Sequence, residues 1–466
     1  MLFNSYIFIL VFLPIILSAW WLLAQWPQIR LGFLVTSSYL FYGWWQWEFT
    51  LLLLTSTLID YYVGLGIHAT SSKRNKALWL SVSLMSNLGM LGYFKYCGFF
   101  AQSINGLLDA VRLGTPINVP EIILPVGISF YTFQTLTYSI DLYRGEVKPA
   151  KSLMHFAAYV SMFPQLIAGP IVRYSDVETQ MQELGTRPNW TAISRGIWFF
   201  VVGMCQKILI ADTVANLAGP LLAEPEQLQL VTGWSALLAY SMQLYFDFSG
   251  YSNMAIGLGL MIGFSFPQNF DSPYKATSIQ SFWRRWHMTL SSFLRDYLYF
   301  PLGGNRYGKL FSYRNLLIVM LLGGFWHGAG WTFILWGLMH GCLLVLNGLF
   351  RDFVKTPIPK TIGMALTFFF VMMGWLLFRS TDLQMAGHWY AAVFFGRGLE
   401  EDFGWSVVKS TGFMVTIASL IFCWLSPNTW NFQPRLSLGT ALVLSALLVV
   451  CILRFDAESP FLYFQF

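Results

Sequence analysis

LLIVMLLGGFWHGAGWTFILWGLMHG occupies residues 316–341, and its composition indicates which kind of fold to expect. Apolar runs flank His327 on both sides, with Trp326 beside it and glycines close by. A helix needs about 20 apolar residues to span a bilayer core. An ionisable side chain at that depth costs free energy unless something uses or satisfies it, so it marks a candidate functional site. The segment predicts a membrane protein with a histidine in its interior.

The composition of the whole chain predicts the same class of protein. Hydrophobic residues make up 56% of the 466 residues and charged residues 11%, whereas soluble domains carry about 25% charged residues. We expect an all-α polytopic integral membrane protein of about 11–13 spans, folded as one membrane domain over residues 1–466. No basic residue precedes Arg30, so the N-terminal apolar run is expected to be a retained span. The basic loop 68–76 is expected on the cytoplasmic side.

Some apolar windows do not fit one straight span. Residues 230–263 and 314–350 are long, and each has room for a bent or doubled helix. Spans are also expected near 121–140 and 154–170, but proline, glycine and polar residues there favour irregular backbone that lines a cavity. Transporters and intramembrane enzymes both contain such backbone, so this pattern does not separate the two classes.

The segment 271–310 is too polar to span and rich in aromatic residues. Trp283, Trp286, Leu290 and Phe293 share one face at helical spacing, which predicts an interfacial or re-entrant helix containing His287. Between residues 284 and 314, Asp296 is the one acid among six basic residues. This charge suits lipid headgroups, or a cavity mouth that attracts a phosphorylated donor, or both. The candidates for lining a donor cavity are Trp283, Arg284, Arg285, Trp286, Arg295, Asn305, Arg306 and Trp326.

Asp247 and Ser249 are two further candidates for lining the donor cavity, and they lie within an apolar stretch, YSMQLYFDFSGYSNMAIGLGLMIGF (240–264). A buried aspartate either binds a partner or takes up a proton. For Asp247 we favour a structural tie, to an arginine or to the backbone, over a direct catalytic role. His340 either faces the same cavity as His327 or serves helix packing. The histidines and the five scattered cysteines lack metal-ligand spacing, so we expect no metal site.

Long motifs in this chain resemble those of the membrane-bound O-acyltransferase (MBOAT) superfamily. The strings QNFDSPYKATSIQSFWRRWHMTLSSFLRDYLYFPLGGNR (268–306) and FWHGAGWTFILWGLMHG (325–341) are most similar to the alginate O-acetyltransferase, AlgI-like branch. PVGISFYTFQTLTYSIDLYRGE (125–146) and FPQLIAGPIVRY (163–174) resemble that branch too. The resemblance covers the chain to about residue 380 and implies an MBOAT-type helical bundle around a central cavity.

The resemblance implies acyl transfer from a thioester to a hydroxyl, with His327 and His287 at the family's two histidine positions. Such a transfer needs a base for the hydroxyl proton, and a desolvated neutral imidazole suits that task. We expect His327 to be this base. His287 is a second base, a residue that orients the donor, or a group that polarises the carbonyl. No tightly bound cofactor is expected, and acetyl-CoA or another acetyl thioester is the expected donor substrate.

The chain ends SPFLYFQF (459–466), within a tail that we place at residues 457–466. Related acyltransfer systems carry such an F-x-Y-x-x-F tail, and its tyrosine has been proposed as a transient acyl carrier. Tyr463 is therefore a candidate nucleophile, a phenol that a nearby histidine deprotonates. The alternative is a hydrophobic anchor at the bilayer surface.

The combined interpretation is a multi-pass O-acetyltransferase of the bacterial inner membrane. It moves acetyl groups from a cytoplasmic donor to a periplasmic partner similar to SGNH hydrolases, which modifies a polysaccharide. An exopolysaccharide of the alginate type or cellulose is the first choice of acceptor, and peptidoglycan is an alternative. We expect contacts with membrane lipid and none with nucleic acid. A transporter or flippase for a polysaccharide precursor, and a scaffold without chemistry, are the rival classes.

Overall fold

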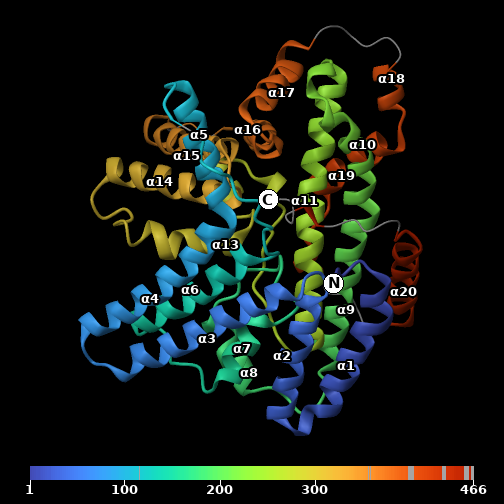
Figure 1. The fold of residues 1–466 in the computed structure, drawn as a ribbon. Coiled ribbons are helices and arrows are strands. Elements are labelled where there is room, and N and C mark those ends of the chain that lie inside the picture. The colour runs from blue at the N-terminus through green and yellow to red at the C-terminus, as the bar shows by residue number, and fades with distance from the viewer. Residues whose placement is uncertain are drawn as a thin grey trace. The chain divides into compact units, whose positions relative to one another are not determined.

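A computed structural model describes residues 1–114, 116–354, 356, 358–396, 403–432, 437–455 and 461–462, and Figure 1 shows their fold. The described residues form helices and connecting segments and contain no strand. The all-α prediction is therefore confirmed for this part of the chain. Tyr463, the candidate acyl carrier, lies outside the described residues.

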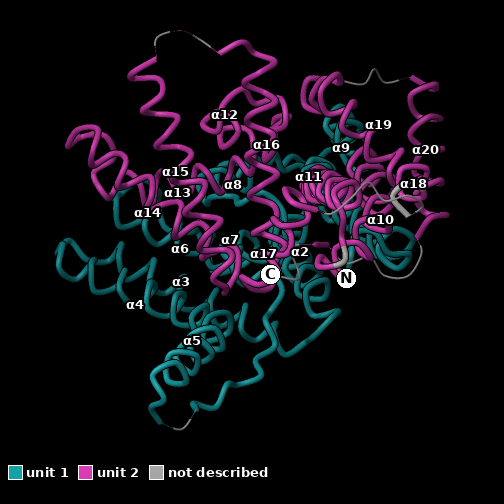
Figure 2. The backbone as a smooth tube through the Cα atoms, turned by 90° about the horizontal axis from the view of Figure 1, so that it is seen from above, with its two compact units in different colours: residues 1–200, 254–267 teal, residues 201–253, 268–466 magenta. Residues whose placement is uncertain are grey.

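The contacts divide the chain into two compact units, coloured separately in Figure 2. Unit 1 comprises Met1–Phe200 and Met254–Pro267, and unit 2 comprises Val201–Asn253 and Gln268–Phe466. Helices α9 (Trp190–Cys205) and α11 (Leu230–Met261) contribute residues to both units. The expectation of a single membrane domain stays a prediction, because this division does not show whether either unit folds alone.

Unit 1 consists mainly of helices from the first half of the chain. Besides part of α9, they are α1 (Leu13–Leu22), α2 (Pro27–Gly43), α3 (Glu48–Ala69), α4 (Lys73–Leu91), α5 (Cys97–Ala110), α6 (Ile128–Arg144), α7 (Leu153–Ser161) and α8 (Tyr174–Gln182). The π-helical turn η3 (Gly92–Tyr96) joins α4 to α5 without a break.

Unit 2 contains the two histidines of interest. Its remaining α-helices are α10 (Asp212–Ala223), α12 (Ile279–Trp283), α13 (Met288–Leu294), α14 (Lys309–His327), α15 (Trp331–Phe353), α16 (Lys360–Arg379), α17 (Leu383–Phe395), α18 (Phe403–Val408), α19 (Thr411–Leu425) and α20 (Leu438–Leu453). The turn η4 (Gln206–Ala211) joins α9 to α10, and η7 (Arg295–Tyr299) continues α13.

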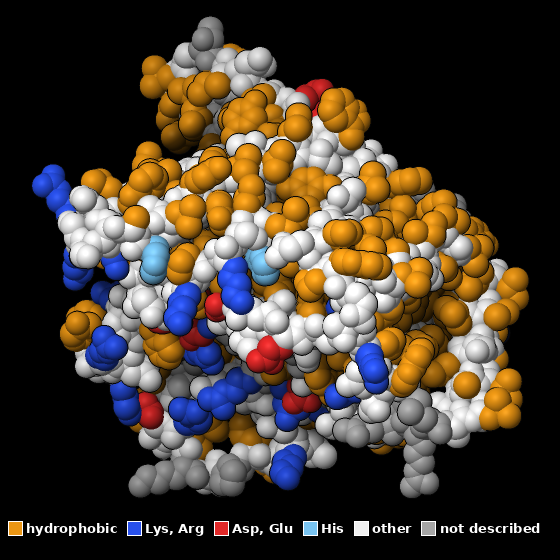
Figure 3. All heavy atoms as spheres, turned by 90° about the horizontal axis from the view of Figure 1, so that it is seen from below, with side chains coloured by type: hydrophobic (Ala, Val, Ile, Leu, Met, Phe, Trp, Pro, Cys, Tyr) orange, Lys and Arg blue, Asp and Glu red, His pale blue; other side chains and the backbone are white. Residues whose placement is uncertain are grey.

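Within the described residues, six helical segments are long and apolar enough to cross a membrane. They are Phe8–Gln25, Glu48–Ala69, Lys73–Ala110, Trp190–Ala223, Trp331–Phe353 and Lys360–Arg379. Large hydrophobic side chains are exposed on these and other helices, and Figure 3 shows broad hydrophobic areas on one face. Leu22 is 75% exposed and Met85 75% exposed, which suits contact with lipid tails.

Residues 314–350 form a doubled helix, and glycines explain why its halves pack closely. A Cβ on Gly324 of α14 would lie 2.3 Å from the backbone oxygen of Phe333 in α15. A Cβ on Gly337 of α15 would lie 2.3 Å from the backbone oxygen of Met320. Small residues of this kind let two membrane helices approach backbone to backbone. The helix pair therefore fixes the turn that follows His327.

The structure shortens two of the expected spans. Helix α6 begins at Ile128, after Gly127 in the left-handed conformation with φ 78°, rather than near residue 121. Helix α7 ends at Ser161, and turns containing Pro164 and Pro170 follow it. Prolines and glycines with a positive φ interrupt helices. The irregular backbone expected from these residues therefore replaces the first part of one expected span and the last part of the other.

Candidate active site

His287 lies in a break between the short helices α12 and α13. Its backbone has φ 43° and ψ 56°, in the left-handed region that residues other than glycine seldom adopt. That conformation costs an L-residue about 1–2 kcal/mol, so surrounding contacts must hold it. The expectation of one continuous helix through Trp283, Trp286 and Phe293 is therefore wrong, because α12 ends at Trp283 and α13 begins only at Met288.

Asn269 holds this break from a position 18 residues earlier in the chain. Its backbone oxygen accepts the N–H of Met288 at 2.9 Å. Its side-chain Oδ1 lies 3.0 Å from Nδ1 of His287 and accepts the Thr289 hydroxyl at 2.9 Å and the Thr289 N–H at 3.4 Å. Its Nδ2 donates to Ser252 Oγ at 3.1 Å. One buried amide thus fixes both the backbone and the imidazole.

This hydrogen bonding determines the tautomer of His287. The Thr289 N–H can only donate, so the Asn269 atom that it contacts is an oxygen acceptor. The His287 Nδ1 facing the same oxygen must therefore hold the proton, and the lone pair resides on Nε2. His287 is fully buried, and burial lowers its pKa to about 3. The ring is neutral at pH 7 and offers Nε2 as a base.

His327 is the last residue of α14 and is 4% exposed. Its ring centroid lies 5.0 Å from that of Trp336 and 5.4 Å from that of Phe378. Trp326 contacts both candidate histidines, with its ring centroid 4.9 Å from His327 and 6.2 Å from His287. Unit 2 therefore brings the two histidines together around one indole.

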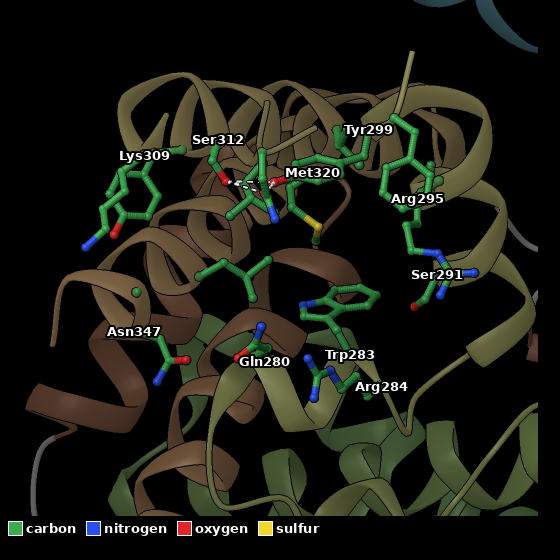
Figure 4. Close-up of a pocket in the computed structure, with 18 of the residues that line it drawn as sticks. Gln280, Trp283, Arg284, Ser291, Arg295, Tyr299, Lys309, Ser312, Met320 and Asn347 are labelled. Carbon is green, nitrogen blue, oxygen red and sulfur yellow. Dashed lines mark hydrogen bonds between the residues drawn. The ribbon is translucent and has the colours of Figure 1, made fainter. Parts of the chain in front are cut away.

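A cavity of about 840 Å³ lies among α12, α13, α14 and α15 (Figure 4). Four of the expected donor-cavity residues line it, namely Trp283, Arg284, Arg295 and Asn305. Figure 4 shows the Trp283 indole and the Met320 thioether pointing toward one another. Its volume falls within the range of about 300–1,000 Å³ that is typical of small-molecule sites.

The lining of this cavity is rich in positive charge. The cationic residues of the lining are Arg284, Arg295, Lys309 and Arg351, and its single acidic residue is Asp352. Asp352 pairs with Lys309 at 2.9 Å, and Arg295 pairs with neighbouring Asp296 at 2.7 Å. Arginine and lysine side chains around a concave site attract anionic groups such as phosphates.

Aromatic side chains separate the cavity from the histidines. Trp283 lines the cavity, and its ring lies 5.7 Å from that of Trp336, which contacts His327. Met288, which follows His287 in the chain, also lines the cavity. The cavity lining contains neither His287 nor His327, and the path from Trp283 to the His327 ring passes through Trp336.

Comparisons with known proteins show the family of this chain. Residues 30–386 match the model of the membrane-bound O-acyltransferase (MBOAT) family. The chain belongs to the MBOAT family. It is 39% identical over 500 aligned positions, covering 100% of both chains, to the "Probable alginate O-acetylase AlgI" of Pseudomonas putida. It is 44% identical to the protein of the same name from Pseudomonas syringae pv. tomato, over 84% of this chain and 75% of the relative. It is 41% identical to the "Peptidoglycan O-acetyltransferase" of Helicobacter pylori, over 83% of this chain and 78% of the relative.

Membership of the MBOAT family confirms the prediction of a membrane-bound O-acyltransferase, which uses an acyl donor. It favours this class over the transporter and the scaffold considered from the sequence. Together with the six membrane-capable segments, it confirms a multi-pass membrane protein. The relatives named above are bacterial, and their membership of this family places the chain in the inner membrane.

The remaining donor-site candidates of this MBOAT chain lie away from the cavity lining. Arg285 forms an ion pair with Asp271 at 3.1 Å and also donates to the backbone oxygen of that residue. Trp286 is buried, with its ring 4.9 Å from that of Trp375. Arg306 is exposed in the turn before α14. Their roles stay predictions.

Asp247 lies in α11 and is bound on both carboxylate oxygens. Its Oδ1 lies 2.7 Å from the ammonium of Lys207, which also pairs with Asp212 at 2.8 Å. Its Oδ2 accepts the backbone N–H of Leu462 at 2.8 Å. The partner is thus a lysine rather than an arginine, together with the backbone. Ser249 is buried, and its hydroxyl contacts no hydrogen-bond partner among the described residues.

Sequence reasoning missed two residues, Lys207 and Asn269, and left the role of a third, His340, open. Lys207 is an ionisable residue within the apolar stretch 194–218, so the rule that singled out His327 should also have found it. Asn269 stands in the quoted motif, but its contact with His287 depends on folding. His340 was left open, and the structure buries it fully with its ring 4.8 Å from that of Trp336.

Proposed function

We propose that this MBOAT chain transfers acetyl groups from a cytoplasmic acetyl thioester, acetyl-CoA, for O-acetylation of a bacterial exopolysaccharide. One observation supports the proposal most strongly. A buried neutral imidazole with its lone pair on Nε2 lies with His327 around Trp326, and Met288, the residue after His287, lines a basic cavity. A base beside a phosphate-attracting cavity is what acyl transfer from a phosphorylated thioester requires.

The chemical step uses these residues as follows. A hydroxyl oxygen attacks the thioester carbonyl carbon, His327 takes the hydroxyl proton, and a C–O bond forms. The C–S bond then breaks, and the thiolate takes the proton from His327 and leaves as the free thiol. His287 acts as a second base, orients the donor or polarises the carbonyl; its neutral tautomer suits the first two of these roles. The aromatic surroundings exclude water, which would otherwise hydrolyse the thioester.

The basic cavity suits the phosphates of acetyl-CoA. Arg284 and Arg295 are planar donors that bind phosphate oxygens in pairs, and Lys309 adds a further positive charge. Trp283 offers a flat surface for an adenine ring or the pantetheine arm. The donor phosphates would stay in this cavity, and the thioester would pass the aromatic layer to reach the imidazoles.

The final acceptor and the partner extend the proposal. Relatives are named for alginate and for peptidoglycan, and we place an alginate-type exopolysaccharide or cellulose first for this chain. A periplasmic SGNH-hydrolase-like protein would receive the acetyl group and pass it to the polymer. Tyr463 would be the transient carrier between the two proteins. Replacing Tyr463 by phenylalanine keeps a hydrophobic anchor and removes the nucleophile, so normal polymer acetylation in Y463F would contradict the carrier role.

The enzymatic proposal is tested by H327A in cells that secrete the polymer. We expect normal membrane levels of the variant, normal polymer secretion and loss of acetyl ester on the polymer, because the base is removed. H388A is the matched control, since His388 is partly exposed and faces Glu226 at 3.5 Å. Unchanged acetylation in H327A would refute the proposal, and lost secretion would favour the transporter.

The donor is tested by R284Q and R295Q in purified protein, with acetyl-CoA as the probe. Loss of one charged phosphate contact corresponds to a KM at least about tenfold higher, whereas kcat stays near the original value. R187Q, which changes an exposed arginine of unit 1, is the control. An unchanged KM in both cavity variants would show that the donor's phosphates bind elsewhere.

A further inference from the structure

The ion pair between Lys207 and Asp247 has no part in the acyl transfer proposed above. Its two side chains are 5% and 3% exposed, and α11 and η4 enclose it in unit 2. A buried pair of this kind is a weak source of stability, because its attraction is offset by the loss of hydration. Such a pair is often retained for a specific task, so its other contacts indicate what it does.

The second carboxylate oxygen of Asp247 holds the C-terminal tail. Oδ2 accepts the N–H of Leu462 at 2.8 Å, and Leu462 is 8% exposed. Phe461 is 2% exposed, with its ring 4.9 Å from that of Tyr251 and 5.6 Å from that of Phe248. Residues 247 and 248 lie one turn before residue 251 on neighbouring positions of α11, so the tail docks on one stretch of that helix.

The docking place is next to a candidate catalytic histidine. The ring of Phe248 packs edge-on against His287, with centroids 4.8 Å apart, and also contacts Phe461. A single phenylalanine therefore separates the docked tail from the imidazole. Tyr463 is the next residue in the chain after Leu462.

We propose that the Lys207–Asp247 pair is a tail anchor, which fixes residues 461–462 on α11 beside His287. Lys207 pairs with Oδ1 of Asp247 at 2.7 Å and holds the carboxylate in place, so that Oδ2 accepts the Leu462 N–H. Both residues are positioning residues, since they act through the tail. The anchor deepens the proposed function, and only its link to acetyl transfer rests on Tyr463 being the carrier.

Direct catalysis by Asp247 is the main alternative. Both of its oxygens are already bonded, Oδ1 to the ammonium and Oδ2 to the backbone amide. A general base needs an oxygen within reach of the substrate proton. The tail would have to leave before Asp247 could take that role, whereas the anchor uses the contacts as they stand.

The decisive experiment removes the hydrogen bond from the tail side. L462P deletes the N–H that Asp247 accepts, and L462A is the matched control that keeps it. Hydrogen–deuterium exchange of the C-terminal peptide is measured in the purified full chain. We expect exchange about tenfold faster or more in L462P and in D247L, and little change in L462A. D212N, which removes the other carboxylate from Lys207, should also leave the exchange slow.

Acetylation of the polymer is then measured in the same variants. The anchor predicts at least a tenfold loss in L462P and in D247L, and no further loss in the double variant, because both changes break one bond. Unchanged exchange in L462P would overturn the anchor, as would a double variant much worse than either single one. Faster exchange in L462P, together with normal acetylation in both L462P and Y463F, would support the anchor and refute the carrier role of Tyr463.

Discussion

Replacing Asn269 by aspartate tests whether the neutral state of His287 matters for the reaction. Aspartate has the shape of asparagine, and its Oδ1 still accepts from His287 and from Thr289. Ser252 reverses from acceptor to donor and keeps its contact. The change therefore places a negative charge 3.0 Å from Nδ1 of His287 with little rearrangement.

The size of the effect follows from this distance. Two unit charges 3.0 Å apart attract by about 5–6 kcal/mol at an effective dielectric constant of about 20, an upper bound for the pair. Opposite charges at such distances shift a pKa by about 1–3 units. The pKa of His287 would rise from about 3 toward about 4–6. Protonation of a base abolishes its function, so activity would fall as the pH drops through that raised pKa.

The assay is the initial rate of transfer from acetyl-CoA between pH 5 and 8. We expect the natural protein to show no acid limb from His287 in this range and N269D to acquire one below about pH 6. N253D is the control, because the Asn253 amide is also buried but donates to Gln206 Oε1 at 2.8 Å. Parallel profiles for N269D and the natural protein would refute the reasoning, as would an equal acid limb in the uncharged variant N269L.

Two further predictions concern stability. A Cβ on Gly328 would lie 2.1 Å from the Phe333 ring, so G328A should cost about 1–3 kcal/mol of stability and lower the melting temperature in detergent. G330A is the control, because a Cβ on Gly330 would lie 3.5 Å from the same ring and should leave the melting temperature unchanged. Equal melting temperatures of G328A and G330A would contradict the argument. Asp382 caps α17 by accepting the Met385 N–H at 2.8 Å, so D382A should cost about 1 kcal/mol in thermal unfolding at neutral pH. That hydrogen bond lowers the pKa of Asp382 in the folded protein. The stabilisation is therefore fully present above the pKa of Asp382 in the unfolded chain and is lost as the pH falls through the folded-state pKa. A stability difference between the natural protein and D382A that persists in strong acid would refute the capping role.

The sequence was sufficient to predict the helical membrane class, and the family resemblance assigned His287 and His327 to the two histidine positions of the acyl-transfer site. Apolar runs like those around His327 recur along the chain at lengths that fit a bilayer. The membrane class can therefore be predicted without knowing any tertiary contact. The doubled helix at 314–350 was anticipated because that apolar window is too long for one straight span. Four of the cavity candidates were found because basic and aromatic residues cluster in one polar segment.

What escaped prediction depends on contacts between residues far apart in the chain. Helical spacing around Trp283 and Trp286 argued for a continuous helix, but the bonds from Asn269 favour a left-handed His287. Helix propensity depends on the local sequence and does not include the free energy of hydrogen bonds from a residue elsewhere in the chain. The partner of Asp247 was also out of reach, since Lys207 lies 40 residues earlier and the amide of Leu462 far later.

The left-handed backbone of His287 has a consequence for interpreting mutants. Alanine at this position would keep the unfavourable conformation and lose the imidazole bond to Asn269 that helps to hold it. An inactive H287A would therefore mix lost chemistry with a relaxed chain between α12 and α13. Glycine adopts this conformation freely, and asparagine does so more readily than most residues. H287G and H287N, compared with H287A, separate the contribution of the ring from that of the backbone turn.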